Sequence, residues 1–498
     1  MSATGSARPT GLVDRTRMAL ARAGQVYHGT VTAARLDAAR DRLDEPLRVA
    51  IAGRVKSGKS TLLNALVGER LAPTDAGECT RIVTWYRDGH TYRVTARPRR
   101  GDPRQLRFTR DDGAIEVDLA DLAPEDVEDL QILWPSQALR GMTLIDTPGI
   151  GSLTAHVASR AWELLVTDDE ETPADAVLYL MRHLHHTDLE FLHAFHDTTV
   201  SRPNPVNAIG ILSRTDEIAV GRLDSMDSAR RIARRLGTDA NVRRVVQTVV
   251  PVAGLLAETA VTLTEAEVGQ LRRVADLTPA EGDELLLSAD RFVTRLPQLG
   301  VTETERRVLL DRFGLFGLRL CAQLLRTGVA PTATALAREL VVHSGLAELR
   351  EVLRSLFDER RDVLKSRSAL LALAGLARAE PRPGSEGVLA EVEEIVASAH
   401  PFQELRVLAS LRAGWVTGKE PVLEELERLI GGRGQAVHLR LDQGPDVGNR
   451  TLAALAQDAL TRWQRRAENP MTSHELALAA RVAVRSCEGM VTELARTG

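Results

Sequence analysis

The sequence predicts a two-part fold, in which an α/β domain with a mostly parallel sheet is followed by an all-α helical domain. Between residues 46 and 300, short apolar runs of β type alternate with stretches of helical periodicity, a pattern typical of a parallel sheet flanked by helices. From residue 301 to residue 498, apolar residues recur at helical spacing and strand signals are few. These two patterns place the division between the domains near residue 300.

The first 45 residues precede the predicted sheet. Apolar residues such as Leu12, Met18 and Leu20 recur there among arginines at helical spacing. Pro46 ends the segment, because a proline breaks the hydrogen-bond ladder of a helix. We expect one or two helices in residues 1–45, and we expect them to pack on the C-terminal helical domain.

Eight apolar runs within residues 46–300 are candidate strands. Each run is short, and most are rich in Val, Ile, Leu, Tyr or Trp. Asp88 and Gly89 stand between two of the runs, and this pair predicts a tight β-hairpin. The candidate strands are Leu47–Ala52, Arg81–Arg87, Tyr92–Arg97, Leu130–Trp134, Met142–Asp146, Ala176–Met181, Ala208–Ser213 and Thr248–Pro251.

Six stretches after residue 301 are candidate helices. The segment Ala379–Gly387 contains two prolines and two glycines, so we expect a turn between long helices there. The candidate helices are Val308–Leu325, Ala333–Leu376, Val388–Leu411, Glu420–Ile430, Leu452–Ala467 and His474–Ala495.

The composition disfavours several classes of protein. A chain of 498 residues is too long for one core, which favours two or three domains. The net charge of −4 argues against nucleic acid as the main partner, because binding to phosphate backbones needs concentrated basic charge. Three widely spaced cysteines indicate a reducing compartment. Since neither a secretory h-region nor a run of 18 apolar residues occurs, we expect a cytoplasmic protein.

The segment Gly53–Ser60 fits the pattern G-x-x-x-x-G-K-S and lies directly between a predicted strand and a helical run. In this context, amides of the loop and of the helix N-terminus bind the phosphates of a nucleotide. We expect Lys59 to bridge the β- and γ-phosphates and Ser60 to bind Mg²⁺. The flanking strand and helix disfavour a chance match. The predicted phosphate-binding residues are Gly53, Arg54, Val55, Lys56, Ser57, Gly58, Lys59, Ser60 and Thr61.

The segment Leu144–Gly149, with the sequence LIDTPG, is the second element of the site. An apolar strand delivers Asp146 to the carboxyl edge of the sheet, where its carboxylate can hold the Mg²⁺ shell. Gly149 can offer its amide to the γ-phosphate and move with it. The pattern D-x-x-G is weak alone, but its place roughly 90 residues after the phosphate loop strengthens it.

The third element, Ser213–Asp216, determines which base is expected. Asp216 can accept hydrogen bonds from N1 and N2 of guanine, which adenine does not provide. The usual motif of GTPases at this place is N/T-K-x-D. Here Ser213 replaces the Asn or Thr and Arg214 replaces the Lys, and the stem of Arg214 can still lie across the purine. The alternative for Asp216 is an acid in a surface turn.

Two weaker signals complete the predicted site. Ala253 and Gly254 follow a strand and are expected to close over the base. Thr80 is the candidate switch residue that reaches Mg²⁺, and Thr74 is the alternative. The predicted ligands are GTP or GDP and Mg²⁺, with the metal held by Ser60, Thr80 and Asp146.

Together, the segments GRVKSGKSTLLNALVGERLAPT, CTRIVTW, LIDTPG and LSRTDEI resemble the dynamin-like large GTPases, in particular their actinobacterial branch. That branch includes the isoniazid-inducible dynamin-like proteins of mycobacteria and the sporulation-septum dynamins of filamentous actinomycetes. The resemblance extends over the whole chain, including Val249–Ala257, Arg312–Leu320 and His400–Leu408. It implies a P-loop GTPase head, residues 46–300, on a helical stalk, residues 301–498. It also implies dimerisation through the heads and work on membranes.

No glutamine follows Gly149 to orient the attacking water, so activation of hydrolysis must come from elsewhere. Lys56 is our candidate, because related large GTPases carry a cationic finger or help to hold a charge-compensating metal at this position of the loop. The predicted catalytic set is therefore Lys56, Lys59, Ser60 and Thr80. A solvated loop lysine is the alternative for Lys56.

The histidines His183, His185 and His186 invite a metal-site interpretation. Their spacing matches no zinc pattern, and neither a cysteine nor clustered carboxylates complete a ligand set. We expect this loop, together with Asp188, to lie by the nucleotide at the head-to-head contact that the resemblance implies.

The resemblance implies a dynamin-like GTPase that uses nucleotide-gated dimerisation to remodel, tether or fuse membrane, in cell division, sporulation or membrane stress. We expect a homodimer, a possible dynamin-like hetero-partner and peripheral contact with lipid. The alternative is a regulatory GTPase switch that acts on a protein partner without membrane work, and Asp216 disfavours an ATP-using enzyme.

Lipid contact must come from an amphipathic or basic tip. The turn Ala379–Gly387 and the stretch Leu411–Lys419, which contains Trp415, are candidates, and ordinary helix connections are the alternative for both. The apolar run Ala369–Ala377 is expected to be stalk core rather than an anchor.

Overall fold

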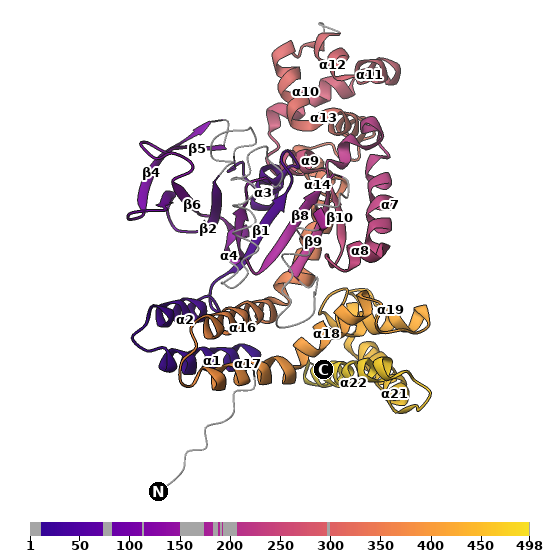
Figure 1. Ribbon diagram of the computed structural model, residues 1–498. Helices are drawn as coiled ribbons and strands as arrows, with labels where there is room; N and C mark the ends of the chain where they lie inside the picture. Colours follow the sequence, from indigo (N-terminus) through magenta and orange to yellow (C-terminus); the bar gives the residue numbers. More distant parts are fainter. Residues whose placement is uncertain are drawn as a thin grey trace.

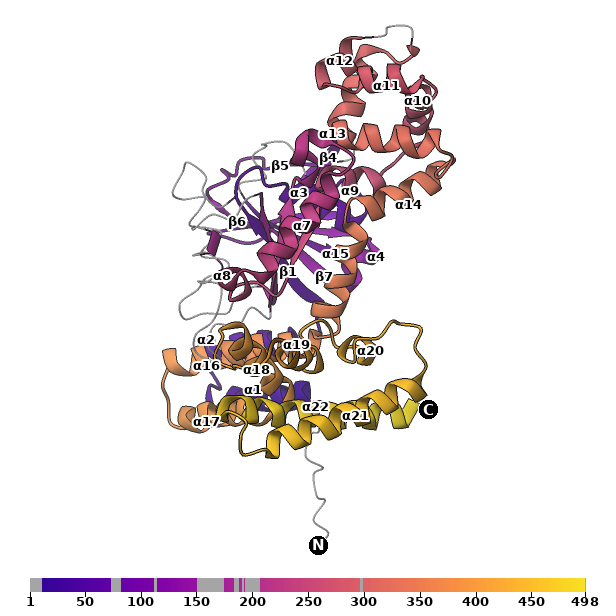
Figure 2. The same cartoon turned by 90° about the vertical axis from the view of Figure 1, so that its right-hand side faces the viewer.

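The computed structural model of the protein describes residues 11–72, 82–111, 114–149, 174–182, 188–189, 192, 207–295 and 299–497. Figure 1 shows three layers: a helical group formed by residues 265–326 at the top, a twisted sheet in the middle, and a second helical group at the bottom. The second group combines residues 12–41 with residues 361–497. The view turned by 90° in Figure 2 shows the same three layers.

The central sheet has ten strands within the described ranges, in the order β10-β9-β8-β1-β7-β2-β6-β3-β4-β5. The half from β10 to β7 is parallel throughout. In the other half, only β2 and β6 pair in parallel. The strands are β1 (Leu47–Gly53), β2 (Val83–Asp88), β3 (Arg93–Pro98), β4 (Arg104–Asp111), β5 (Ala114–Asp118), β6 (Val127–Trp134), β7 (Met142–Asp146), β8 (Ala176–Met181), β9 (Ala208–Ser213) and β10 (Val249–Val252).

The strands of the parallel half are buried on both faces, because helices cover both sides of this part of the sheet. Val49 and Ile51 of β1 belong to the same hydrophobic cluster as α3 and α9, whereas Ala50 and Ala52 belong to the cluster that contains α7. The predicted α/β fold with a mostly parallel sheet is therefore confirmed. The flanking helices are α3 (Lys59–Val67), α4 (Gln137–Gly141), α7 (Ser225–Thr238), α8 (Ala240–Arg243) and α9 (Gly254–Val261), together with a 3₁₀ helix at Thr215–Gly221.

The predicted hairpin across Asp88 and Gly89 is wrong. Strand β6 lies between β2 and β3, so that Leu130 of β6 pairs with Thr84 of β2 on one side and with Ala96 of β3 on the other. A two-residue turn signal is local, whereas strand pairing depends on which side chains are buried across the whole sheet. Leu130 is fully buried, and this burial favours a central place for β6.

The sequence does not predict β4 and β5. These strands pair with each other at the edge of the sheet. Most side chains of β4 are exposed, including Arg104, Arg107 and Arg110. An edge strand that is largely solvated needs no apolar run, so hydrophobic periodicity does not reveal it.

The upper helical group packs around its own hydrophobic cluster, which includes Phe292, Phe313 and Leu336. Thr264, Thr278 and Thr302 form capping boxes with a glutamate three residues later, which explains where α10, α11 and α13 begin. The helices of the group are α10 (Glu265–Ala275), α11 (Pro279–Leu285), α12 (Ala289–Thr294) and α13 (Glu303–Arg326), and α14 (Ala333–His343) packs beside them against α13 and α9. The helical residues after 301 therefore divide between two clusters: α13 and α14 pack on this upper cluster, and the helices of residues 361–497 belong to the lower group.

The predicted continuous helix Ala333–Leu376 is interrupted, and Gly345 explains the first interruption. Gly345 has a φ of 79°, and a Cβ at this position would collide with the carbonyl oxygen of Pro251 at the end of β10. Beside it, the carbonyl of Ser344 accepts a hydrogen bond from the amide of Ala253, at 2.9 Å. The chain then continues as α15 (Leu346–Leu353), a π-helical turn (Arg354–Asp358) and α16 (Arg361–Ala379).

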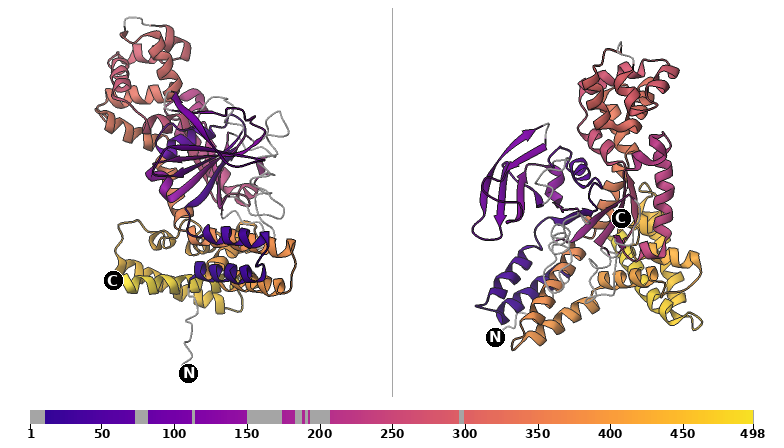
Figure 3. Two further views of the ribbon diagram at one scale, coloured as in Figure 1. Left: turned by 90° about the vertical axis from the view of Figure 1, so that its left-hand side faces the viewer. Right: turned by 45° about the horizontal axis from the view of Figure 1, so that its top comes forward.

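In the lower group, the N-terminal helices pack against α16 and α17, as both views in Figure 3 show. The hydroxyl of Tyr27 donates to the carbonyl of Glu380 at 2.8 Å, in the predicted turn between α16 and α17. The run Ala369–Ala377 is largely buried, as expected for core. The boundaries at residues 45 and 300 stay predictions. The helices are α1 (Leu12–Val26), α2 (Val31–Asp41), α17 (Ser385–Ser398), α18 (His400–Arg412), α19 (Glu420–Leu429), α20 (Val437–Arg440), α21 (Asn449–Glu468) and α22 (His474–Thr497).

A buried carboxylate, Glu404, joins three elements of the lower group. It accepts hydrogen bonds from Arg440 Nη1 at 2.8 Å and from Ser486 Oγ at 2.7 Å, and His400 Nε2 lies 3.4 Å away. Burial by itself would raise the pKa of Glu404, but these donors and the charge of Arg440 hold the pKa at about 2.

The low pKa of Glu404 predicts acid lability of the lower helical group. A folded-state pKa of about 2 lies below the unfolded value of about 4.3. The carboxylate therefore contributes stability above about pH 4.3, and this contribution is lost as the pH falls toward 2. The difference between the urea midpoints of unfolding at pH 7 and at pH 3 should be smaller for Glu404→Gln than for wild type. The exposed control Glu468→Gln should show the same difference as wild type. Equal pH dependence in wild type and Glu404→Gln would contradict the assignment.

Candidate nucleotide-binding site

The phosphate loop lies between β1 and α3, where the sequence predicts it. Gly53 ends β1 with a φ of 146°, and a Cβ there would collide with the carbonyl oxygen of Leu180 in β8. Gly58 caps α3 with a φ of 94°, a conformation that favours glycine. The two glycines let the chain turn sharply from the strand into the helix, so that the free amides of the first turn of α3 face the loop.

Lys59, the first residue of α3, folds back over the loop. Its Nζ donates to the carbonyls of Gly53 at 3.3 Å and Arg54 at 3.2 Å. Burial lowers the pKa of Lys59, and the nearby charge of Asp146 opposes that shift. Weak carbonyl contacts leave the ammonium able to exchange them for phosphate oxygens, which bind a cation more strongly.

Ser60 and Asp146 meet because β1 and β7 are parallel neighbours, with Ile51 paired to Asp146. Ser60 Oγ donates to Asp146 Oδ2 at 3.0 Å, while the other carboxylate oxygen is buried without a hydrogen-bond partner. Burial raises the pKa of Asp146. A hydroxyl beside a carboxylate with an unsatisfied oxygen provides the hard oxygen ligands that Mg²⁺ prefers, so the residues fit this ion.

Gly149 lies directly against the phosphate loop. A Cβ at this position would lie 2.6 Å from Val55 Cγ2 and 2.8 Å from Val55 Cα. Only glycine allows this close approach between the segment after β7 and the loop after β1. The predicted switch glycine is thus in contact with the residues that would hold the phosphates.

The predicted base-reading acid lies beside a cavity of about 220 Å³. Asp216 is half-buried in the 3₁₀ helix after β9, and burial raises its pKa. Gly254 begins α9 on another side of the cavity, and Ala253 beside it is held by Ser344. The lining residues are Ser57, Gly58, Thr61, Leu62, Leu180, Ile211, Ser213, Arg214, Asp216, Glu217, Val252, Gly254 and Leu255.

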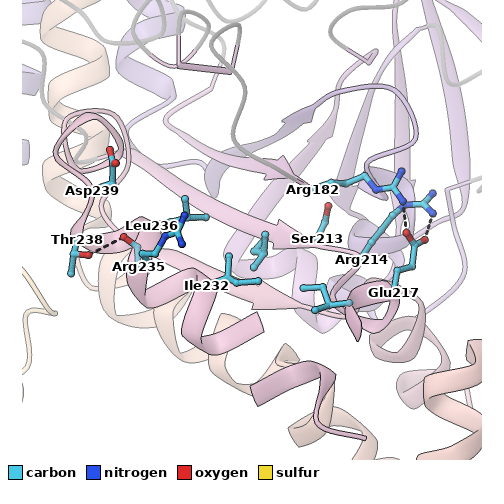
Figure 4. A pocket seen from close by; sticks show the side chains of 11 residues that line it. Arg182, Ser213, Arg214, Glu217, Ile232, Arg235, Leu236, Thr238 and Asp239 are labelled. Atoms are coloured by element: carbon cyan, nitrogen blue, oxygen red, sulfur yellow. Dashed lines mark hydrogen bonds and ion pairs between the residues drawn. The ribbon is translucent and has the colours of Figure 1, made fainter. Parts of the chain in front are cut away.

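Arg214 bridges the base segment and the phosphate loop. Its Nε donates to the carbonyl of Lys56 at 3.0 Å, and its Nη1 donates to Glu217 Oε1 at 2.5 Å. Glu217 also accepts a hydrogen bond from Arg182 at the end of β8, and Figure 4 shows the two guanidinium groups on one carboxylate. Neither Glu217 nor Arg182 belongs to a sequence motif of the predicted site. The sequence offers one signal for Glu217, namely that it is an acid directly after Asp216.

A second, larger cavity of about 840 Å³ lies on the other side of the base segment. It shares Ser213, Arg214 and Glu217 with the smaller cavity and extends along α7 to Asp239, as Figure 4 shows. The base segment therefore separates two hollows, of which only the smaller one reaches Gly58 and Gly254.

Several predicted residues lie outside the described residues. These are Thr74 and Thr80, the candidate switch residues, and His183, His185 and His186. Asp188 is described and is almost fully buried, where it accepts a hydrogen bond from the hydroxyl of Tyr179 at 2.6 Å. Its carboxylate is therefore engaged within the chain, and the expectation that its loop lies at a head-to-head contact stays a prediction.

Among the described residues, no group of three or more His, Cys, Asp or Glu side chains could hold a metal ion. The Mg²⁺ site suggested above uses one hydroxyl and one carboxylate, with phosphate oxygens and water supplying the rest, so it does not need such a group. In the same described ranges, no helix combines the length and the apolar character that a bilayer span requires.

The phosphate-loop motif, Asp146 and Asp216 lie at the carboxyl ends of β1, β7 and β9, along one edge of the parallel sheet. This arrangement defines a P-loop protein of the GTPase class. Residues 49–213 match the model of the dynamin family. The chain is 40% identical over 487 residues to isoniazid-induced protein IniC of Mycobacterium tuberculosis, covering 96% of this chain and 98% of that protein. The chain belongs to the dynamin family. This membership implies, in general, binding of guanine nucleotide and hydrolysis of GTP.

Other relatives match over shorter stretches. Isoniazid-induced protein IniA of Mycobacterium tuberculosis is 29% identical over 254 residues, which are 47% of this chain and 35% of that protein. The bacterial dynamin-like protein of Nostoc punctiforme is 34% identical over 120 residues, which are 22% of this chain and 17% of that protein. A solved structure described as an oligomerised bacterial dynamin pair, with a role in long-range sensing and tethering of membranes, is 12% identical with a TM-score of 0.29, covering 97% of this chain and 75% of that chain. The fold assignment rests on the family match and on the strand order.

Proposed function

We propose that this protein binds GTP with Mg²⁺, hydrolyses it to GDP and phosphate, and couples the reaction to peripheral work on a membrane. The observation that carries the proposal is the contact of Ser60 with Asp146 beside the phosphate loop, next to a cavity of about 220 Å³ that Gly58 of the loop and Asp216 both line. In this proposal the protein is cytoplasmic and reaches lipid only peripherally.

In the proposed reaction, each residue acts on a different part of the nucleotide. The loop amides and Lys59 bind the β- and γ-phosphates, which places the γ-phosphate for in-line attack by water. Ser60 and Asp146, with Thr80, would hold Mg²⁺, which would neutralise charge on the phosphate oxygens. Gly149 binds the γ-phosphate through its amide and senses its loss. Lys56 supplies positive charge as phosphate charge develops.

Competition between nucleotides tests the binding step. Purified protein is first loaded with labelled GDP and Mg²⁺. Unlabelled GTP or GDP should displace the bound label, whereas ATP at the same concentration should not. Removal of Mg²⁺ by a chelator should weaken the binding of GTP. Equal competition by ATP, or no retention of either nucleotide, would overturn the proposed function.

Assembly through the heads is the second part of the proposal, and it rests on the family resemblance. A head dimer, or a pair with a related dynamin-like chain, would complete the site and raise turnover per chain. The turnover number should therefore rise with protein concentration, and a GTP analogue should increase the mass measured by light scattering. Turnover that is independent of concentration, without any response to lipid, would favour a regulatory GTPase switch instead.

The stretch Leu411–Lys419 is the better of the two candidate lipid contacts. Trp415 is 46% exposed, and Met471 in the turn between α21 and α22 is 90% exposed. The two connections are neighbours, because a Cβ on Gly418 would lie 3.5 Å from Leu476 at the start of α22. The turn Ala379–Gly387 instead packs on α1, since Tyr27 binds Glu380 and Gly384 lies against Val26.

Substitution of these exposed side chains tests lipid contact. The double variant Trp415→Ala/Met471→Ser should bind anionic liposomes at least about tenfold more weakly than wild type, because both apolar groups would lose their burial in the bilayer interface. Leu287→Ala is the control, since Leu287 is 61% exposed between α11 and α12, two helices that lie at the opposite end of the molecule from α21 and α22 in Figure 1. Co-sedimentation in the apo, GDP and GTP-analogue states measures the effect. Unchanged binding of the double variant would exclude this tip.

A further inference from the structure

Two residues of the nucleotide site share an unusual backbone conformation. Among the described residues, only Lys56, Ala120, Arg214 and Asp442 combine a side chain with a positive φ. Lys56 has a φ of 61° and Arg214 has a φ of 53°. Both values lie in the left-handed region, which residues other than glycine rarely adopt. Such conformations persist only where surrounding contacts hold them, and they concentrate at functional sites.

The two left-handed residues are bonded to each other. Arg214 Nε donates to the carbonyl of Lys56 at 3.0 Å, although the residues are 158 positions apart in the chain. The opposite side of the guanidinium donates to Glu217, which Arg182 also binds. In Figure 4 the carboxylate of Glu217 lies between the two arginines. Glu217 therefore fixes the orientation of the guanidinium, and the guanidinium fixes the peptide plane after Lys56.

We propose that Arg214 is a positioning residue for Lys56, and that the chain Arg182–Glu217–Arg214 couples occupation of the base pocket to the catalytic competence of the phosphate loop. This inference rests on the proposed function. A left-handed φ determines the direction in which the Lys56 side chain leaves the backbone, so the hydrogen bond to its carbonyl controls where the ammonium can reach. Arg214 stands two residues before Asp216, so closing of the base pocket acts on the same bond.

The exposure of these charges separates a catalytic effect from a structural one. The side chains of Arg182, Arg214 and Glu217 are 47%, 37% and 45% exposed. Ion pairs at this exposure contribute little to stability. A loss of activity on breaking them should therefore occur without a change in the melting temperature.

Arg214→Met tests the proposal, because methionine keeps an apolar stem for the purine and removes the donors. We expect kcat for GTP to fall about 10- to 100-fold, in line with the cost of misplacing a catalytic group by about 1 Å. The Kd for GDP and the melting temperature should change little. Arg214→Lys should recover most of kcat, because an ammonium can also donate to the carbonyl of Lys56. Arg222→Met is the matched control, since Arg222 lies in the same connection and pairs with Asp224 in solvent.

A double-mutant cycle shows whether Arg214 acts through Lys56. If it does, Lys56→Ala combined with Arg214→Met should be no slower than Lys56→Ala alone, because the group being positioned is already absent. An equal further loss in the Lys56→Ala background would overturn the proposal, as would wild-type kcat in Arg214→Met or an Arg214→Lys variant as slow as Arg214→Met. Failure of wild type to bind or hydrolyse GTP would instead overturn the proposed function, so the two failures are distinguishable.

Discussion

Asp216→Asn is expected to lower the affinity for GTP by at least about 100-fold and to remove the preference for guanine. Asp216 is half-buried beside the base cavity, and in the ionised state it offers two acceptor oxygens to N1–H and the 2-amino group. Asparagine places an NH₂ group opposite at least one of these donors. A buried donor facing a donor loses a hydrogen bond and leaves two groups unsatisfied, which is a large penalty in a closed pocket.

The chemistry of the base provides a positive control for this substitution. Xanthine carries a 2-oxo group in place of the 2-amino group, so the amide of asparagine can donate to it. The variant should therefore bind xanthosine triphosphate better than GTP, measured by competition against a fluorescent diphosphate. Asp224→Asn is the matched control, because Asp224 is 54% exposed in the same connection. Retention of the GTP preference by Asp216→Asn would mean that another residue reads the base.

The parts of the fold that the sequence predicts are those where local chemistry and burial agree. The strand before Gly53 is apolar because helices cover both its faces, so pattern and structure coincide there. The turn signal at Asp88 fails because the pairing of β2 depends on β6, which lies about 40 residues further along the chain. Gly345 interrupts a helical pattern for a reason that lies in β10, where a side chain would meet Pro251. Such long-range contacts leave no local mark on the sequence.

The candidate site shows the same division. Lys59, Ser60, Asp146 and Asp216 occur in motifs whose spacing follows from phosphate and base chemistry, and the structure brings them to one edge of the sheet. Glu217 and Arg182 lie in no motif. Their role depends on side-chain geometry between two strand ends, which only the folded chain reveals. The left-handed conformation of Lys56 is equally invisible in a sequence, because the loop pattern leaves its position open.

Lys56→Ala is expected to lower kcat for GTP by about 100-fold or more while leaving the Kd for GDP within about threefold. A cationic finger stabilises charge that develops only in the transition state, so its loss affects turnover and spares ground-state binding. Fingers are worth roughly 10³–10⁵ in rate, and a flexible lysine is expected toward or below the lower end. Lys419→Ala, in lipid-free assays, is the control for removal of an exposed lysine.

Two further substitutions separate the charge of Lys56 from its backbone conformation. Glycine adopts a φ of 61° without strain, so Lys56→Gly relaxes the loop and removes the cation at the same time. Lys56→Arg keeps the cation and the strained conformation. If charge is what matters, Lys56→Gly should be as slow as Lys56→Ala, and Lys56→Arg should retain a substantial part of kcat. Fast turnover in Lys56→Gly would show that the loop needs the conformation and not the ammonium, and the compensating charge would then have to come from a bound cation or from a partner chain.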